Sequence, residues 1–277
     1  MSDLILAHCA SLRAGGLSRR TVEAREDWLR RADRVMPFGV VEADRTELEL
    51  FLGTDDWAPA TRSKAFYHLR SFYLWGCDPA NGTDGPILED DPMEGMRRPR
   101  VPKGEPNPVS DEELRIVLEQ AREPYLTAVI LAVGAGLRCS ELAVQRREDV
   151  SEEFVRVRFG KGGKSASVPT SAAVWEHVRD FPRGRLLEHV GGIADGRKLS
   201  ARASIYFART LKLPGVSLHR FRHKFADLLR IGGADIATIS RCLRHQHLSS
   251  TQVYARATEA ECRFAVSTLR LRDQTPN

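Results

Sequence analysis

The chain has no apolar run long enough to cross a membrane. Its longest apolar stretch, residues 128–137, is about half the length that a bilayer span requires. The first 16 residues lack the basic leader and apolar centre of a signal peptide, so we expect none. The five cysteines form no Cys-X-X-Cys pair, and their odd number argues against a disulfide framework. These absences predict a cytoplasmic protein with free thiols and no membrane association.

Composition excludes two further classes. Apolar residues make up 42% and charged residues 29% of the 277 positions, which fits neither a disordered nor a fibrous chain. The net charge of +5 is uneven, because the first 100 residues carry −3 and the remainder +8. Arginine outnumbers lysine in this excess, and arginine suits bidentate contacts with phosphate. A polyanionic partner and an arginine-biased genome explain the excess equally well, so charge alone does not decide between them.

Four prolines fall within residues 97–108, a segment without helical or strand periodicity. We therefore expect a helical domain over 1–100, a proline-rich linker over 101–108 and a second domain over 109–277. Helical spacing predicts helices over about 21–35, 45–52 and 60–75, with no alternating strand before the linker. The first domain is thus predicted to be a small helical bundle.

The second domain is predicted to be mostly helical with a small antiparallel sheet. Ser110 and Glu113 form a capping box that begins one helix, and a second helix covers about 125–133. Residues 154–159 alternate strictly, and a glycine-rich turn leads to a return strand over 165–169. The remaining predicted helices cover about 170–180, 200–211, 218–231 and 235–244, and short helices follow.

The helix over 218–231 carries polar residues that are candidates for chemistry. Residues three or four apart share a helix face, so His219, Arg222 and His223 lie together, opposite Phe221 and Phe225. A solvated polar face explains the same pattern. The helix alone therefore leaves both interpretations open.

A second candidate is Arg138, which follows the glycines of Gly-Ala-Gly-Leu-Arg138. These glycines should end one helix and Ser140 should begin another, which places Arg138 at a helix junction beside amide groups that attract anions. Glu141 is close enough to form a salt bridge with Arg138. A purely structural ion pair remains the alternative.

Lys161 lies at the tip of the predicted hairpin, in Gly-Lys161-Gly-Gly-Lys-Ser. This is not a nucleotide-binding phosphate loop, because Arg158 stands where the first glycine is required and a strand follows instead of a helix. Downstream, the Ser-Ser-Thr run before Tyr254 favours a helix start, and Tyr254 alone is also explained as a packing residue.

The histidines do not have the surroundings of a metal site. His219 and His223 are four apart, but Arg220 stands where a metalloprotease helix carries its glutamate. His245 and His247 are the other close pair, and neighbouring arginines repel a cation. The chain also lacks the Gly-X-Ser-X-Gly elbow of serine hydrolases. We expect no metal and no other cofactor.

Taken in order, these segments resemble the tyrosine recombinases of the phage-integrase and Xer type, and the similarity covers the whole chain. The matching segments are Gly-Leu-Arg138-Cys-Ser-Glu141-Leu, Gly-Lys161-Gly-Gly-Lys, His219-Arg-Phe-Arg222-His223, Leu-Arg-His245 and Tyr254. No single motif is specific, but the order and spacing together are. One departure is Arg244, where the family usually has glycine.

The resemblance implies a core-site DNA-binding domain of the SAM-like helical type, followed by the catalytic domain. Tyr254 would attack a phosphodiester to form a 3′-phosphotyrosyl bond. The other implied roles are phosphate clamping by Arg138 and Arg222, general acid catalysis by Lys161, general base catalysis by His219, phosphate binding by His245, and support by Glu141 and His223. The implied partners are double-stranded DNA and three further copies of the chain.

Three hypotheses follow from the sequence. The first is a site-specific recombinase, most simply a temperate-phage integrase, with a host Xer-type or transposon recombinase as alternatives. The second is a DNA-binding regulator of the same fold that does not cut, and the third is a metallohydrolase.

Because the chain begins near the core-binding domain, we expect a short recognition site. The apolar stripe over 258–271 packs either on its own domain or, as the resemblance implies, on a neighbouring protomer.

Overall fold

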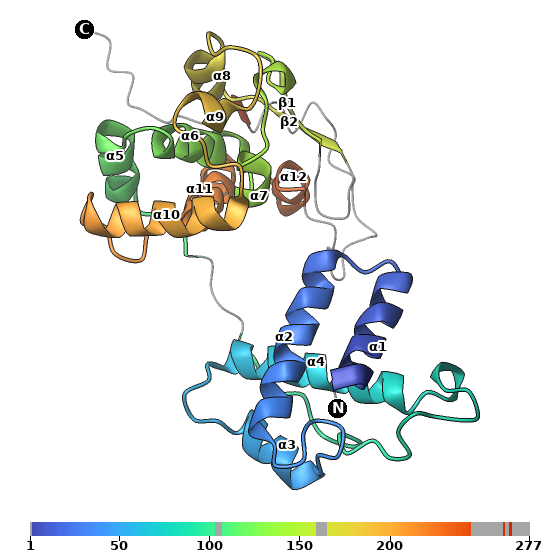
Figure 1. The fold of residues 1–277 in the computed structure, drawn as a ribbon. Coiled ribbons are helices and arrows are strands. Elements are labelled where there is room, and N and C mark those ends of the chain that lie inside the picture. The colour runs from blue at the N-terminus through green and yellow to red at the C-terminus, as the bar shows by residue number, and fades with distance from the viewer. Residues whose placement is uncertain (1, 103–106, 159–164, 245–262, 264–265, 268–277) are drawn as a thin grey trace, which may run out of the picture. The chain divides into compact units, whose positions relative to one another are not determined.

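The computed structural model describes residues 2–102, 107–158, 165–244, 263 and 266–267. The chain divides into two compact units, Met1–Gly104 and Glu105–Asn277 (Figure 1). Within the described residues both units are mainly helical, and the second contains a two-stranded antiparallel sheet, so the predicted fold class is confirmed. The function assigned to each unit stays a prediction. No helix in the described ranges has the length and apolar character of a membrane span.

The first unit is a helical bundle, as the periodicity predicts. Its elements are α1 (Ser2–Ala14), α2 (Arg19–Val35), α3 (Arg45–Leu52), α4 (Pro59–Gly76) and the short 3-10 helix η1 (Pro79–Asn81). Ser18 caps α2, and Asp44 with Glu47 forms a capping box at the start of α3. Helix α1 is not predicted from the sequence because its buried face includes the polar His8, which interrupts the apolar pattern.

The core of the first unit contains several aromatic side chains, and one of them, Tyr73, forms a buried hydrogen bond. Leu29 of α2, Leu48 of α3 and Leu69 of α4 are fully buried in one cluster. The hydroxyl of Tyr73 donates to the carbonyl of Val40 at 2.6 Å, so a buried phenol is satisfied by the turn that follows α2.

The second unit surrounds one very apolar helix. Its elements are α5 (Asp111–Gln120), α6 (Tyr125–Ala135), α7 (Cys139–Leu142), the 3-10 helix η2 (Arg147–Asp149), β1 (Phe154–Val157), β2 (Ala166–Pro169), α8 (Ala172–Val178), α9 (Leu186–His189), α10 (Gly196–Arg209), α11 (Leu218–Ile231) and α12 (Ile236–Cys242). Every residue of α6 from Thr127 to Ala135 is buried, which is why α6 shows no amphipathic pattern. The β1–β2 pair aligns Val155 with Val168, as expected for a hairpin.

The junction after α6 decides where the polar residues meet. Gly136 ends α6 in a left-handed conformation (φ 60°), and a Cβ at this position would lie 2.6 Å from the ring of Phe225 in α11. Only glycine therefore allows α11 to approach the α6–α7 turn this closely. The chain then enters α7. Arg244, just after α12, donates to the carbonyl of Gly136 in this turn.

The proline-rich segment is attached at each end to its own unit. Arg98 donates to the hydroxyl of Ser63 at 2.9 Å, within the first unit. Arg220 of α11 donates to the carbonyls of Asn107 and Pro108 at 3.3 and 3.1 Å, within the second. The described parts of residues 97–108 contain no helix or strand.

Candidate active site

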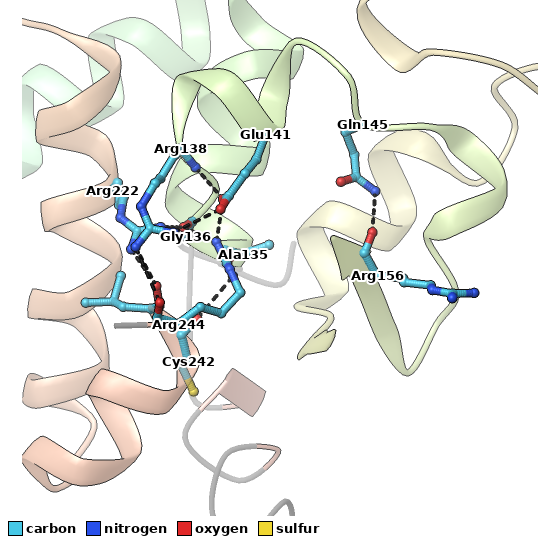
Figure 2. A network of polar contacts seen from close by, with 10 residues as sticks. Ala135, Gly136, Arg138, Glu141, Gln145, Arg156, Arg222, Cys242 and Arg244 are labelled. Carbon is cyan, nitrogen blue, oxygen red and sulfur yellow. Dashed lines mark hydrogen bonds and ion pairs between the residues drawn. The ribbon is translucent and has the colours of Figure 1, made fainter. Parts of the chain in front are cut away.

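Arg138 lies immediately before α7 and forms a reciprocal pair with Glu141. The backbone N–H of Arg138 donates to Glu141 Oε2 at 2.8 Å, and its Nη1 donates to Oε1 at 2.9 Å (Figure 2). The predicted helix junction and salt bridge are both present. The predicted helix start at Ser140 is wrong, because α7 begins at Cys139 with Arg138 as its N-cap residue, and Glu141 accepts from the Arg138 amide.

Arg222 of α11 is buried, with only 4% of its surface exposed, and does not lie on a solvated face. Its Nη2 donates to the carbonyl of Leu243 at 2.5 Å, and its Nη1 donates to the carbonyl of Gly136. Of the two interpretations left open by the sequence, the solvated face is therefore wrong at this position, because Gly136 before α7 and Leu243 after α12 cover the side chain. Burial, together with the charges of Arg138 and Arg244, lowers the pKa of Arg222 to about 9.

His219 and His223 lie one turn apart on α11, as the spacing predicts. Their ring centroids are 4.5 Å apart in an edge-to-face arrangement. Burial lowers the pKa of both rings. His223, Arg222 and Arg138 lower the pKa of His219 further, and Arg222 does the same for His223. Both imidazoles are thus neutral near pH 7, which suits His219 to accept a proton.

Arg244, for which the sequence suggests either an altered local turn or an added phosphate contact, joins the same cluster. Its Nη2 donates to Glu141 Oε2 at 2.7 Å and to the carbonyl of Gly136 at 2.9 Å (Figure 2). The signal that pointed to it is the replacement of a usual family glycine by arginine. Arg138 and Arg244 therefore both pair with Glu141, and Arg222 binds the same Gly136 carbonyl as Arg244. The excess of positive charge in this cluster attracts an anion.

Lys224 is a second residue that sequence reasoning missed. Its side chain is almost completely buried, and Nζ pairs with Asp111 at 2.6 Å and Asp227 at 3.6 Å. These contacts join α11 to the start of α5 and give Lys224 a structural role. The spacing of Lys224 and Asp227 is a local signal, but the pairing with Asp111 requires the tertiary fold.

Three predicted site residues, Lys161, His245 and Tyr254, lie outside the described residues. The strands that flank Lys161 are described, and Arg158 at the end of β1 pairs with Asp149 at 2.6 Å. Thus the structure brings together Arg138, Glu141 and Arg222 and places both histidines on the same helix as Arg222. Within the described ranges, no group of histidines, cysteines or carboxylates could hold a metal ion.

The chain thus has two helical units, with arginines gathered around a carboxylate in the second, and its fold is shared by solved integrase structures. Residues 110–261 match the phage integrase family. The chain belongs to this family and is a tyrosine recombinase, the class of enzyme that breaks and rejoins DNA. The resemblance drawn from the motifs is therefore confirmed.

Two archaeal relatives carry the name tyrosine recombinase XerA. That of Thermococcus kodakarensis is 29% identical over 260 residues, covering 79% of this chain and 92% of the relative. That of Thermococcus onnurineus is 33% identical over 198 residues, covering 66% of this chain and 69% of the relative. Each of these alignments covers more of this chain than the second unit alone contains.

Solved structures show the same fold. The integrase of mycobacterium phage Brujita is 26% identical, with a TM-score of 0.51 over 96% of this chain and 92% of that protein. A lambda integrase tetramer bound to a Holliday junction has a TM-score of 0.68 at 15% identity, covering 90% of this chain and 78% of that one. At this low identity the lambda structure supports the fold alone.

Proposed function

We propose that this tyrosine recombinase cuts and rejoins double-stranded DNA at specific sites through a 3′-phosphotyrosyl bond to Tyr254. The observation that carries the proposal is the convergence of Arg138 and Arg222 on one small region beside His219. The positive charge of the two arginines favours binding of an anion such as a phosphate. Tyr254 follows these residues along the chain in the order typical of the family. A regulator that binds DNA without cutting would not need these groups together with a tyrosine.

The contacts of the two arginines favour different tasks. The Arg138 side chain is 26% exposed, and its Nη2 contacts two carbonyls only at 3.4 and 3.5 Å. These weak contacts leave that edge of the guanidinium available to a phosphate oxygen. Arg222 is more buried and is engaged with two carbonyls, so it would stabilise the site and add positive charge near Arg138.

The reaction we propose transfers one phosphoryl group from the 5′ oxygen of the DNA to the Tyr254 oxygen. The Tyr254 oxygen attacks phosphorus while the bond from phosphorus to the 5′ oxygen breaks. His219, kept neutral by its lowered pKa, accepts the tyrosine proton, and Lys161 protonates the leaving 5′ oxygen. His245 binds the phosphate, and Glu141 and His223 orient the groups that touch it.

The assembly we propose is a homotetramer on two DNA duplexes. Joining two duplexes requires four cleavages, and a cyclic head-to-tail contact among four copies supplies four active sites. Lambda integrase, which shares the fold, has been captured as a tetramer on a Holliday junction. Accessory proteins and a cytoplasmic location stay predictions.

Two biological roles have separate support. A temperate-phage integrase is favoured by the 26% identity to the Brujita integrase over nearly the whole chain. A Xer-type role is favoured by the archaeal and bacterial relatives that carry that name. The neighbouring genes distinguish them, because a phage repressor and an attachment site beside the gene would support the integrase role and their absence would favour Xer.

The test of the reaction is covalent capture on a nicked DNA substrate that loses its 5′ end after cleavage. The wild-type chain should form a protein–DNA adduct that survives denaturation, and Tyr254→Phe should form none while still shifting DNA in a gel. Tyr125→Phe, the same chemical change in the stacked pair with Tyr206, is the matched control and should retain the adduct. An adduct from Tyr254→Phe would contradict the assignment.

Metal dependence is tested in the same assay. Two arginines supply the positive charge that the transition state needs, so we expect adduct formation to continue in excess chelator. Loss of the adduct in chelator, with recovery on adding zinc, would contradict this mechanism.

A further inference from the structure

Position 244 has a backbone conformation that disfavours arginine. Its φ is 56°, in the left-handed region, where a Cβ crowds the following carbonyl and glycine is the easiest residue to accommodate. An arginine persists in such a conformation only where its surroundings determine it strongly. The side-chain contacts of Arg244 are therefore the place to look for a function.

Those contacts connect the end of α12 to the turn between α6 and α7. Nη1 donates to the carbonyls of Cys242 at 3.2 Å and Ala135 at 3.4 Å. Nη2 donates to the carbonyl of Gly136 at 2.9 Å and to Glu141 Oε2 at 2.7 Å (Figure 2). Only 8% of the side chain is exposed, so the guanidinium is held inside the site and does not extend into solvent.

Glu141 is consequently shared between two arginines. Its side chain is 1% exposed, Oε1 accepts from Arg138, and Oε2 accepts from Arg244 and from the Arg138 amide. The three side chains together carry a net charge of +1. With glycine at position 244, Glu141 would pair with Arg138 alone and cancel its charge.

We propose that Arg244 is a positioning residue that holds Glu141 between two guanidinium groups and thereby keeps Arg138 both fixed and incompletely neutralised. This inference rests on the proposed function, in which Arg138 binds the scissile phosphate. The alternative role for Arg244 is a direct contact with DNA. Its buried Nε has no hydrogen-bond partner among the described residues, so this nitrogen still has a hydrogen bond to give.

The experiment is a double-mutant cycle between positions 244 and 141, measured as the single-turnover rate of covalent adduct formation. Arg244→Gly should slow adduct formation at least about tenfold, since Glu141 then pairs with Arg138 alone and neutralises its charge. Half-site affinity in a gel shift should change less than about twofold, because the effect is on the transition state. Arg244→Lys, which restores the charge with a single nitrogen, should recover part of the rate.

The second half of the cycle is decisive. In the Glu141→Gln background no carboxylate remains to be shared, so Arg244→Gly should change the rate less than about twofold. An equal loss in both backgrounds would show that Arg244 acts independently of Glu141, as in a direct DNA contact, and would overturn the proposal. An unchanged rate for Arg244→Gly alone would also overturn it.

Lys212 provides the backbone control. It is exposed and also left-handed (φ 59°), so Lys212→Gly relieves the same conformation away from the site and should leave the rate unchanged. If Arg244→Gly does not fold, Arg244→Asn replaces it, since asparagine tolerates this conformation.

Thermal unfolding of the same four proteins in the cycle tests the contact without any reaction. The two substitutions should be coupled in Tm, and additive shifts would overturn the contact. If the wild-type chain forms no adduct although the Tm values are coupled, the proposed function fails and the positioning role fails with it. An active wild type with additive effects refutes the inference alone.

Discussion

Arg222 Nη2 lies 2.5 Å from the carbonyl oxygen of Leu243 and so ties α11 to the residue that follows α12 (Figure 2). The other terminal nitrogen of Arg222 binds the carbonyl of Gly136, at the end of α6. One buried guanidinium therefore connects three helices. A residue that the family resemblance assigns to catalysis is also part of the scaffold that shapes the site.

We predict that Arg222→Ala and Arg138→Ala both lose adduct formation but differ in stability. Each should slow cleavage by about 10²-fold or more. Arg222→Ala also removes two buried hydrogen bonds, to the carbonyls of Gly136 and Leu243, which should lower the free energy of unfolding by about 2–4 kcal/mol. Arg138→Ala should cost less, because Arg244 still pairs with Glu141. Denaturant unfolding and single-turnover cleavage measure the two effects. Equal stability losses would contradict the buried role of Arg222.

We predict that Lys161 is the general acid. Lys161→Ala should slow cleavage by about 10²-fold on ordinary DNA, because the leaving 5′ oxygen then lacks its proton donor. A substrate with sulfur in place of that oxygen should restore the rate, since a thiolate leaves without protonation. Arg138→Ala should not be rescued in this way and is the matched control. Absence of rescue in Lys161→Ala would assign the proton to another group.

We predict that acid destabilises the first unit through His8. Burial, with a smaller contribution from the charge of Arg25, lowers the pKa of His8 to about 4 from the ordinary 6.5. Because the unfolded chain binds the proton more readily, stability is full above pH 6.5 and falls as the pH drops towards 4. The loss attributable to His8 is up to about 3 kcal/mol.

Unfolding of wild type and His8→Leu at a series of pH values checks this. The variant should show a flatter loss of stability between pH 6.5 and 4, because leucine has no charge to bury. The ring of His8 lies 5.0 Å from that of Trp75, so tryptophan fluorescence reports the transition in this unit. An unchanged slope in the variant would show that His8 is not the group responsible.

We predict that the C-terminal segment stabilises its own unit before any assembly. Val266 is 1% exposed and packs in one cluster with Phe225 and Leu229 of α11, which favours, at this position, the alternative of packing on its own domain. Val266→Ala should therefore lower the stability of the DNA-free monomer by roughly 1–2 kcal/mol. An unchanged Tm at low protein concentration would contradict the packing within one chain and favour docking in trans.

The sequence by itself determined the features that depend on neighbours along the chain. The helix over 45–52 was predictable because its capping residues and apolar spacing are local. The β1–β2 hairpin was predictable because alternation and a glycine turn lie next to each other. The Arg138–Glu141 pair follows from a separation of three residues in one turn. These local signals, in their order, were enough to identify the family.

Only the tertiary structure decided which polar groups share a buried site. Arg222 appears on a polar helix face by periodicity, yet carbonyls from the ends of α6 and α12 bury it. Arg244 and Glu141 are about 100 residues apart, and no pattern along the chain predicts their 2.7 Å contact. Such contacts arise because packing of α11 against α6 brings distant turns together, and a low-dielectric interior then makes each charge depend on its neighbours.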